Sequence, residues 1–150
     1  MNVLVTGASS LIGRFTVAAL TRRGHSVTTL QRRRVGIGQH EISAQITDRA
    51  ALARATANQD AVVHLAAKVG VTGSWAEYEA ANVTGTRLLL EAARDAGVGR
   101  FVHVSSPSVA HAGTALVGVG AEPADPWGAR GHYAISKAQG EQLALAASSE

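Results

Sequence analysis

Apolar positions along the chain alternate between short β-branched runs and stretches that recur at helical spacing. The first run, Val-Leu-Val at residues 3–5, is typical of a buried parallel strand. A turn of small residues follows. From Leu11 to Ala19 the apolar positions then recur at helical spacing, which predicts a helix over residues 11–23 that stops at Gly24. The chain therefore opens with a strand, a tight turn and a helix.

The same alternation continues along the rest of the chain. It predicts further strands at residues 25–30, 41–46, 60–66 and 100–105, and helices at 48–57, 75–81, 82–96 and 131–148. Thr47 is the expected cap of the helix at 48–57, and a long loop is expected at 106–130. Strands that alternate with helices predict one α/β domain over residues 1–150, a doubly wound parallel sheet of the Rossmann type with strand order 3-2-1-4-5.

Composition indicates a globular protein, because 46% of the 150 residues are hydrophobic and only 17% are charged. No apolar run reaches the roughly 20 residues that span a bilayer, and no signal-peptide core follows the start. The chain has no cysteine, so disulfides and thiolate metal sites are excluded. We therefore expect a cytoplasmic protein without a membrane span or a metal site.

The net charge of +3 and the arginines at residues 32–34 raise the question of nucleic-acid binding. Such binding needs a basic face, preferably with aromatic side chains on which bases can stack. Aromatic residues make up only 4% of this chain and lie elsewhere. We therefore expect a small-molecule ligand and no nucleic-acid partner.

The turn after the first strand, T-G-A-S-S-L-I-G at residues 6–13, has the residue types of a phosphate-binding loop. Gly7 admits backbone angles that are closed to other residues, and Gly13 lets the helix approach the strand. The free N–H groups at the helix start then face the anion. The candidate dinucleotide contacts in this turn are Gly7, Ser9, Ser10, Leu11, Ile12 and Gly13. A structural turn that binds nothing is the alternative interpretation.

This T-G-x-x-[GS]-x-I-G pattern resembles the extended short-chain dehydrogenase/reductase family, which includes NAD(P)-dependent epimerases and dehydratases. The family's usual form has Gly in place of Ser10 and often Phe in place of Leu11. The binding of the cofactor is therefore expected to differ slightly here. The resemblance implies an NAD(P)-binding domain over nearly all of the chain. It also implies a substrate-binding region that would follow residue 150.

Cofactor choice is predicted from the end of the second strand. NAD enzymes of this fold usually place a carboxylate there, which binds the ribose hydroxyls of adenosine. That register falls on the neutral Gln31, and Arg32 and Arg33 follow at once. A guanidinium binds a 2′-phosphate with charge-assisted bonds of roughly 1.5–3 kcal/mol. We therefore expect NADP, with NAD less favoured; a solvated basic turn is the alternative.

Two further segments resemble the cofactor-lining parts of the family. H-L-A-A at residues 64–67 resembles its [NH]-x-A-A segment, although His64 itself is interpreted as a structural histidine. The family often has G-D-[LI] near the third strand, where its Asp contacts adenine, and this chain has Gln45 and Ile46 there. The cofactor contacts that the resemblance implies are Gln45, Ile46, Leu65, Ala66 and Ala67 in these segments, and also Tyr133 and Lys137, of which Lys137 binds the nicotinamide ribose.

The catalytic segments of the family also have counterparts. Tyr133 and Lys137 form Y-x-x-x-K, which places both side chains on one helical face. A phenol with a pKa near 10 exchanges protons near neutrality only if its pKa falls by roughly 3 units, and a nearby ammonium favours that fall. N-V-T-G-T at residues 82–86 resembles the N-x-x-G-T segment, which implies that Asn82 shapes the active-site helix; a buried structural Asn is the alternative.

A serine segment completes the set. V-S-S-P-S-V at residues 104–109 resembles the family's S-S-x-x-V, and the alignment makes Ser106 the residue that holds the substrate oxygen. Epimerases and dehydratases commonly continue with Y-G, whereas Ala110, His111, Ala112 and Gly113 follow here. This departure favours the hydroxysteroid dehydrogenase-like branch.

The sequence thus predicts an NADP-dependent oxidoreductase that transfers hydride between nicotinamide and a secondary alcohol or ketone. Two alternatives stay open: a sugar-nucleotide epimerase or dehydratase, and a dinucleotide sensor without turnover. The strand at residues 100–105 would be an open sheet edge, which favours self-association such as a homodimer. We expect the isolated 150-residue chain to bind cofactor weakly and to show little turnover, as the N-terminal part of a longer protein.

Overall fold

The computed structural model describes residues 1–110, 117, 120 and 122–149. The strands in these residues are β1 (Asn2–Thr6), β2 (Ser26–Gln31), β3 (His40–Ser43), β4 (Ala61–His64) and β5 (Arg100–His103). The α-helices are α1 (Leu11–Arg22), α2 (Arg49–Thr56), α3 (Trp75–Tyr78), α4 (Gly85–Asp95) and α5 (Gly131–Ala146). A π-helix, η1 (Glu79–Thr84), joins α3 to α4, and η2 (Pro107–Ala110) and η3 (Ala147–Ser149) are 3-10 helices.

The chain groups into two compact units, which we describe separately. The first unit is Met1–Ala66 with Leu88–Val104, and the second is Ala67–Arg87 with Ser105–Glu150. The sequence pattern predicts no such division, because the chain crosses between the units just after a strand or inside a helix. The expectation of one domain over the whole chain stays a prediction.

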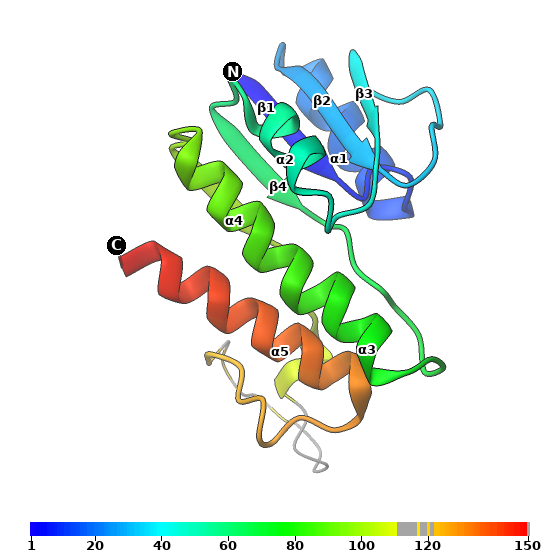
Figure 1. Cartoon of the computed structure of the whole chain (residues 1–150), viewed down its shortest axis with the longest axis vertical. Helices are drawn as coiled ribbons and strands as arrows, with labels where there is room; N and C mark the ends of the chain where they lie inside the picture. Colours follow the sequence, from blue (N-terminus) through cyan, green and yellow to red (C-terminus); the bar gives the residue numbers. More distant parts are fainter. Residues whose placement is uncertain (111–116, 118–119, 121, 150) are drawn as a thin grey trace. The chain divides into compact units, whose positions relative to one another are not determined.

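The first unit is built on a five-stranded parallel sheet whose order is β3-β2-β1-β4-β5. Figure 1 labels the first four of these strands. This order confirms the predicted Rossmann-type sheet. β1 pairs with β2 up to Thr6↔Leu30 and with β4 up to Thr6↔His64. The parallel register therefore brings the carboxyl ends of β1, β2 and β4 to one edge, where sheets of this class bind their ligands.

Apolar side chains of the sheet alternate between its two faces, as the two-residue period of a strand requires. One face packs against α2 and α4 through a buried cluster that includes Leu4, Leu30, Leu52, Val62 and Leu89. The other face packs against α1 through a cluster that includes Val3, Val5, Val17 and Val27. Leu4 therefore faces α2 and α4, while Val3 and Val5 on either side of it face α1.

The second unit is organised around α5, which packs against η1, η2 and α3. Its buried cluster is Val109, Ala124, Ala129, Ala134 and Ala138. Two side chains of α5 also hold the segment before it: the N–H of Ala124 donates to Glu141 Oε1 at 2.9 Å, and Gln142 Nε2 donates to the Ala124 carbonyl at 3.1 Å. Small residues at this contact let the segment lie close to the helix.

Several local predictions need correction. β3, β4 and β5 end at Ser43, His64 and His103, each before the predicted end. Asp48 and not Thr47 caps α2, because its Oδ1 accepts from the Ala51 N–H at 3.0 Å. The two helices expected at 75–81 and 82–96 are α3, the π-helix η1 and α4 in direct succession. Among the described residues, no helix combines the length and the apolar character that a bilayer crossing needs.

Candidate functional site

The turn after β1 brings two glycines against neighbouring backbone. Gly7 has a φ of +71°, and a Cβ there would lie 2.7 Å from the backbone nitrogen of Ala66. A Cβ on Gly13 would collide with the carbonyl oxygen of Gly7. The Gly7 N–H donates to the carbonyl of Leu30 at 3.1 Å, which fixes the turn beside the end of β2. Only glycine fits both positions, and the turn is left with bare backbone at the ligand-binding edge of the sheet.

Ser10, which stands where the family usually has Gly, is the N-cap of α1. Its Oγ accepts a hydrogen bond from the Gly13 N–H at 3.0 Å. The first-turn N–H groups of Leu11 and Ile12 have no acceptor within the helix, by the geometry of any α-helix start. The side chains of Ser9, Leu11 and Ile12 are exposed. Ser10 therefore satisfies one donor of the helix start, and two donors remain that can face an anion.

Thr6 is a residue of this edge that the sequence analysis does not single out. Its Oγ1 accepts from the Ala66 N–H at 3.2 Å and lies 2.7 Å from Nδ1 of His64. The His64 side chain is fully buried, and its ring centre lies 5.4 Å from that of His103. These contacts explain His64 as a structural residue that joins β4 to β1.

The end of β2 carries the predicted determinants of cofactor choice. Gln31 is its last residue and is only 5% exposed, and its Nε2 donates to the carboxylate of Glu41 on β3. Arg32 and Arg33 follow and are both exposed. Glu41 was not predicted from the sequence: the register pairs it with Thr29, two residues before Gln31, and the Gln31 amide reaches it along the same face of the sheet.

The remaining cofactor candidates also have packing positions. Ile46 packs partly buried against the cluster on the α2 and α4 face, and Leu65 packs against the cluster on the α1 face. Gln45 is exposed, and its carbonyl accepts from the Asp48 N–H at 3.1 Å in the turn that leads to α2. Ala66 and Ala67 are half-buried. All of these except Ala67 belong to the first unit.

Asn82 lies in the π-helix of the second unit and uses its whole side-chain amide. Its Oδ1 accepts from the Lys68 N–H at 2.7 Å, and its Nδ2 donates to the Lys68 carbonyl at 3.0 Å. Nδ2 also donates to Ser136 Oγ at 2.9 Å, and both side chains are buried. Asn82 therefore links the segment after β4 to α5, and a π-helical turn at this residue is a feature often found at functional sites.

Tyr133 and Lys137 lie one turn apart on α5, as the sequence predicts. Ser136 Oγ donates to the Tyr133 carbonyl at 2.9 Å, so the hydrogen bonds of Asn82 extend to the backbone of Tyr133. Lys137 is only 4% exposed. Burial lowers the pKa of Lys137 to about 8, and the nearby Glu141 carboxylate opposes that change. The Lys137 side chain therefore changes between its ammonium and amine forms near pH 8.

Ser106 lies immediately before η2. Its Oγ lies 2.8 Å from Ser108 Oγ, and the Ser108 N–H donates to it at 3.3 Å. Val109 of η2 packs in the cluster formed with α5, which holds this segment against the helix. The neighbouring Ser105 Oγ is buried and has no hydrogen-bond partner in the described part of the chain. Residues 111–113, on which the branch assignment partly rests, lie outside the described residues.

A basic and aromatic cluster lies at the start of α5 and was not predicted. Lys68 Nζ lies 5.0 Å from the centre of the Tyr78 ring and 3.5 Å from Glu77 Oε1. The His132 ring, which directly precedes Tyr133, has its centre 6.0 Å from that of Tyr78 and 5.8 Å from that of Trp75. The cluster packs the segment that carries Lys68 against the start of the helix that carries Tyr133.

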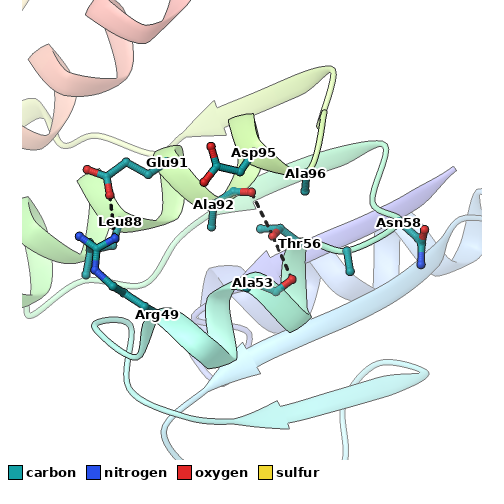
Figure 2. A pocket seen from close by; sticks show the side chains of 10 residues that line it. Arg49, Ala53, Thr56, Asn58, Leu88, Glu91, Ala92, Asp95 and Ala96 are labelled. Carbon is teal, nitrogen blue, oxygen red and sulfur yellow. Dashed lines mark hydrogen bonds and ion pairs between the residues drawn. The ribbon is translucent and has the colours of Figure 1, made fainter.

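A groove of about 510 Å³ lies between α2 and α4 in the first unit and contains none of these candidates (Figure 2). Arg49 and Glu91 form an ion pair of 3.1 Å across it, and Thr56 Oγ1 donates to the Ala92 carbonyl at 3.2 Å. The described residues also include no group of three or more His, Asp or Glu placed to hold a metal ion. The candidate cofactor-binding residues therefore lie at the carboxyl edge of the sheet and the candidate catalytic pair lies on α5, not in this groove.

Comparison with known proteins agrees with these features. The family model described as the NAD dependent epimerase/dehydratase family matches residues 3–150. The 2-alkyl-3-oxoalkanoate reductase of Stenotrophomonas maltophilia is 40% identical over 98% of this chain and 46% of its own length. The 3-beta-hydroxysteroid dehydrogenase of Mycolicibacterium neoaurum is 35% identical over 77% of this chain and 35% of its own length.

A solved structure, MoeE5 in complex with UDP-glucose and NAD, superposes with a TM-score of 0.87 at 35% identity. The match covers 100% of this chain and 50% of that one. The chain spans about half the length of the curated relatives that it matches most extensively. The likeness to this solved structure agrees with the five-stranded parallel sheet described above.

Proposed function

Because the chain belongs to the NAD dependent epimerase/dehydratase family, we propose that it carries the cofactor-binding and catalytic residues of an NADP-dependent oxidoreductase. The proposed reaction is hydride transfer between nicotinamide and a secondary alcohol or ketone. The observation that carries this proposal is the arrangement on α5: Tyr133 and Lys137 lie one turn apart, Lys137 is buried, and Asn82 and Ser136 hold the helix. These three features suit acid–base chemistry more than a purely structural role.

The glycine turn fits a dinucleotide, because it has no room for a Cβ at Gly7 and leaves helix-start donors for a pyrophosphate. A bound nicotinamide would supply or accept the hydride. In the reducing direction the Tyr133 hydroxyl gives its proton to the carbonyl oxygen, and Ser106 donates a hydrogen bond to the same oxygen. Lys137, when charged, favours the phenolate that Tyr133 becomes. In the oxidising direction the phenolate takes the proton back.

For the cofactor, NADP is our proposal because Gln31 offers no carboxylate and two exposed arginines follow it. For the substrate, the 40% identical relative is a 2-alkyl-3-oxoalkanoate reductase and another relative is a hydroxysteroid dehydrogenase. We therefore propose a ketone or secondary alcohol on an apolar skeleton, with 3-oxoalkanoates and ketosteroids as the first compounds to assay. A cytoplasmic location and a homodimer also remain predictions.

A second candidate is a sugar-nucleotide epimerase or dehydratase, which forms a transient ketone and reduces it again. The observation that favours it is the likeness to MoeE5, whose structure holds UDP-glucose and NAD. The sequence after Val109 disfavours this candidate, because it lacks the Tyr-Gly that commonly follows the serine segment in epimerases and dehydratases. A dinucleotide sensor without turnover is less favoured, because Ser106, Tyr133 and Lys137 are all present.

The test is a screen for oxidation of NADPH, followed by its absorbance, with the natural protein and a panel of simple ketones, 3-oxoalkanoates, ketosteroids and nucleotide sugars. We expect net oxidation with at least one ketone and none with nucleotide sugars. Conversion of a nucleotide sugar without net change in NADPH would instead support the second candidate. Cofactor binding without turnover of any compound would support the sensor.

A further inference from the structure

A loop connects β2 to β3 (Figure 1). It is held by a carboxylate that has no role in the proposed reaction. Glu41 Oε1 accepts from the Val35 N–H at 2.6 Å, and Oε2 accepts from the Gly36 N–H at 3.3 Å. The same carboxylate accepts from Gln31 Nε2. One side chain of β3 therefore fixes both the last residue of β2 and the backbone that follows the arginines at 32–34.

The carboxylate also dictates which way the Gln31 amide points. A carboxylate only accepts hydrogen bonds, so the amide must turn its Nε2 toward Glu41. Its Oε1 is then left buried and without a hydrogen-bond donor in the described part of the chain. A buried acceptor without a donor is costly, so the hydrogen bond to Glu41 is what holds the amide in this orientation. The Gly7 turn lies beside Leu30, the residue before Gln31, so a dinucleotide bound at the turn would bring a ribose to this end of β2.

We propose that Glu41 is a positioning residue that sets the preference for a 2′-phosphate over a 2′-hydroxyl on the adenosine ribose. It anchors residues 35 and 36, so the preceding arginines are presented at the end of β2, and it holds the Gln31 side chain in one orientation there. The inference rests on the proposed dinucleotide-binding function and adds to it a residue that touches neither the cofactor nor the substrate.

Other contacts support this anchoring role. Ser43 Oγ donates to the Arg32 carbonyl at 3.1 Å, and Thr29 Oγ1 donates to the Ile37 carbonyl at 3.0 Å, so β2 and β3 hold the loop at both of its ends. The Val35 N–H, followed by the Gly36 N–H, Gln31 and Arg34, holds the pKa of Glu41 below its usual value against the opposing effect of desolvation. The carboxylate is therefore charged throughout the neutral range.

Glu41 could affect the affinity for a 2′-phosphate through its negative charge or through the backbone that it positions. The two roles predict opposite changes in that affinity when Glu41 is replaced. Replacing Glu41 with Gln removes a negative charge beside the arginines, and by Coulomb's law alone a 2′-phosphate would then bind more tightly. If Glu41 acts by position, the 2′-phosphate binds less tightly, because a neutral amide leaves the Val35 and Gly36 N–H groups poorly paired and frees the Gln31 amide to turn. Glu41→Asp keeps the charge but shortens the side chain by one methylene, so it disturbs the position alone.

The experiment measures the affinities of 2′,5′-ADP and 5′-AMP by calorimetry for the natural protein and for variants of it that carry substitutions in this chain. These fragments need only the adenosine end of the site. For the unsubstituted chain we expect 2′,5′-ADP to bind at least about tenfold more tightly than 5′-AMP. We expect E41Q and E41D each to lower that ratio at least about fivefold. The control E91Q, which removes a carboxylate of the α2–α4 groove, should keep the ratio within about twofold.

Amide hydrogen exchange shows whether a variant is still folded. Exchange at Val35 and Gly36 should accelerate in E41Q, while the amides of β1 and β4 stay protected. A ratio that is unchanged or raised in E41Q overturns the role of Glu41 and leaves the proposed NADP preference standing. A chain that binds 5′-AMP as tightly as 2′,5′-ADP overturns both the NADP preference and this inference. A chain that binds neither overturns the dinucleotide site itself.

Discussion

Ser136→Ala tests the link between the π-helix and α5 directly. The substitution removes the acceptor of the Asn82 Nδ2 bond of 2.9 Å and the donor to the Tyr133 carbonyl. Ser136 is 0% exposed and Asn82 is 1% exposed, so water cannot replace the lost partner without rearrangement. An unsatisfied buried donor costs about 1–3 kcal/mol, against which alanine regains at most about 0.5 kcal/mol of helix propensity. We expect the free energy of unfolding to fall by about 0.5–3 kcal/mol.

The chain offers a matched control and a local probe for this measurement. Ser148→Ala removes a hydroxyl that donates to the Ala144 carbonyl at 3.1 Å, but at an exposed position. It should change the free energy of unfolding by no more than about 0.5 kcal/mol. The two tryptophans, Trp75 and Trp127, both belong to the second unit, so their fluorescence in urea follows that unit. If the two variants unfold at the same urea concentration, the bond between Asn82 and Ser136 does not stabilise the unit and the reasoning fails.

Three further predictions follow from the described contacts. Tyr133→Phe should lower turnover by roughly 10²–10⁴ while cofactor affinity measured by calorimetry is kept, because only the proton-bearing oxygen is lost. Folding lowers the pKa of Lys137 from 10.5 to about 8, so the unfolded chain binds this proton more tightly than the folded chain. The free energy of unfolding should therefore rise as the pH increases from about 8 to above 10, by up to about 3 kcal/mol. Urea unfolding of Lys137→Met should lack this rise, and equal pH dependence in both proteins would contradict the assignment. Thr6→Val removes the acceptor of the Ala66 N–H and the partner of His64, and should cost about 1–3 kcal/mol in urea unfolding; a value near zero would show that the buried pair adds nothing.

The fold could be predicted because its signals are local. The β-branched runs, the glycine turn and the helical periods each occupy a short stretch, and the parallel order follows from their alternation. The exact strand ends could not be predicted, since pairing between strands decides where β3 and β5 stop. Asp48 was missed as a cap because Thr47 and Asp48 are both good capping residues and only the start of α2 distinguishes them.

Candidate site residues that belong to a short motif could be predicted from the sequence. Contacts between residues far apart in the sequence could not. Tyr133 and Lys137 share a helix, so their spacing suffices to pair them. The bond between Asn82 and Ser136 joins residues 54 apart, and the bond between Thr6 and His64 joins residues 58 apart. Such pairs depend on how the elements pack, which a single sequence does not reveal. The π-helix around Asn82 was not predicted either, because its pattern of apolar residues is that of an ordinary α-helix.

We propose that this chain belongs to an enzyme that moves a hydride between NADP and a ketone. The most direct test gives the natural protein NADPH carrying two deuterium atoms at C4 of the nicotinamide, together with a ketone on which it is active in the NADPH screen. Mass spectrometry of the product alcohol then shows where the label goes. We expect one deuterium on the carbinol carbon and, in Tyr133→Phe, roughly 10²–10⁴-fold less of the labelled alcohol formed in the same time. An alcohol that forms without deuterium on the carbinol carbon would show that the hydride does not come from the nicotinamide.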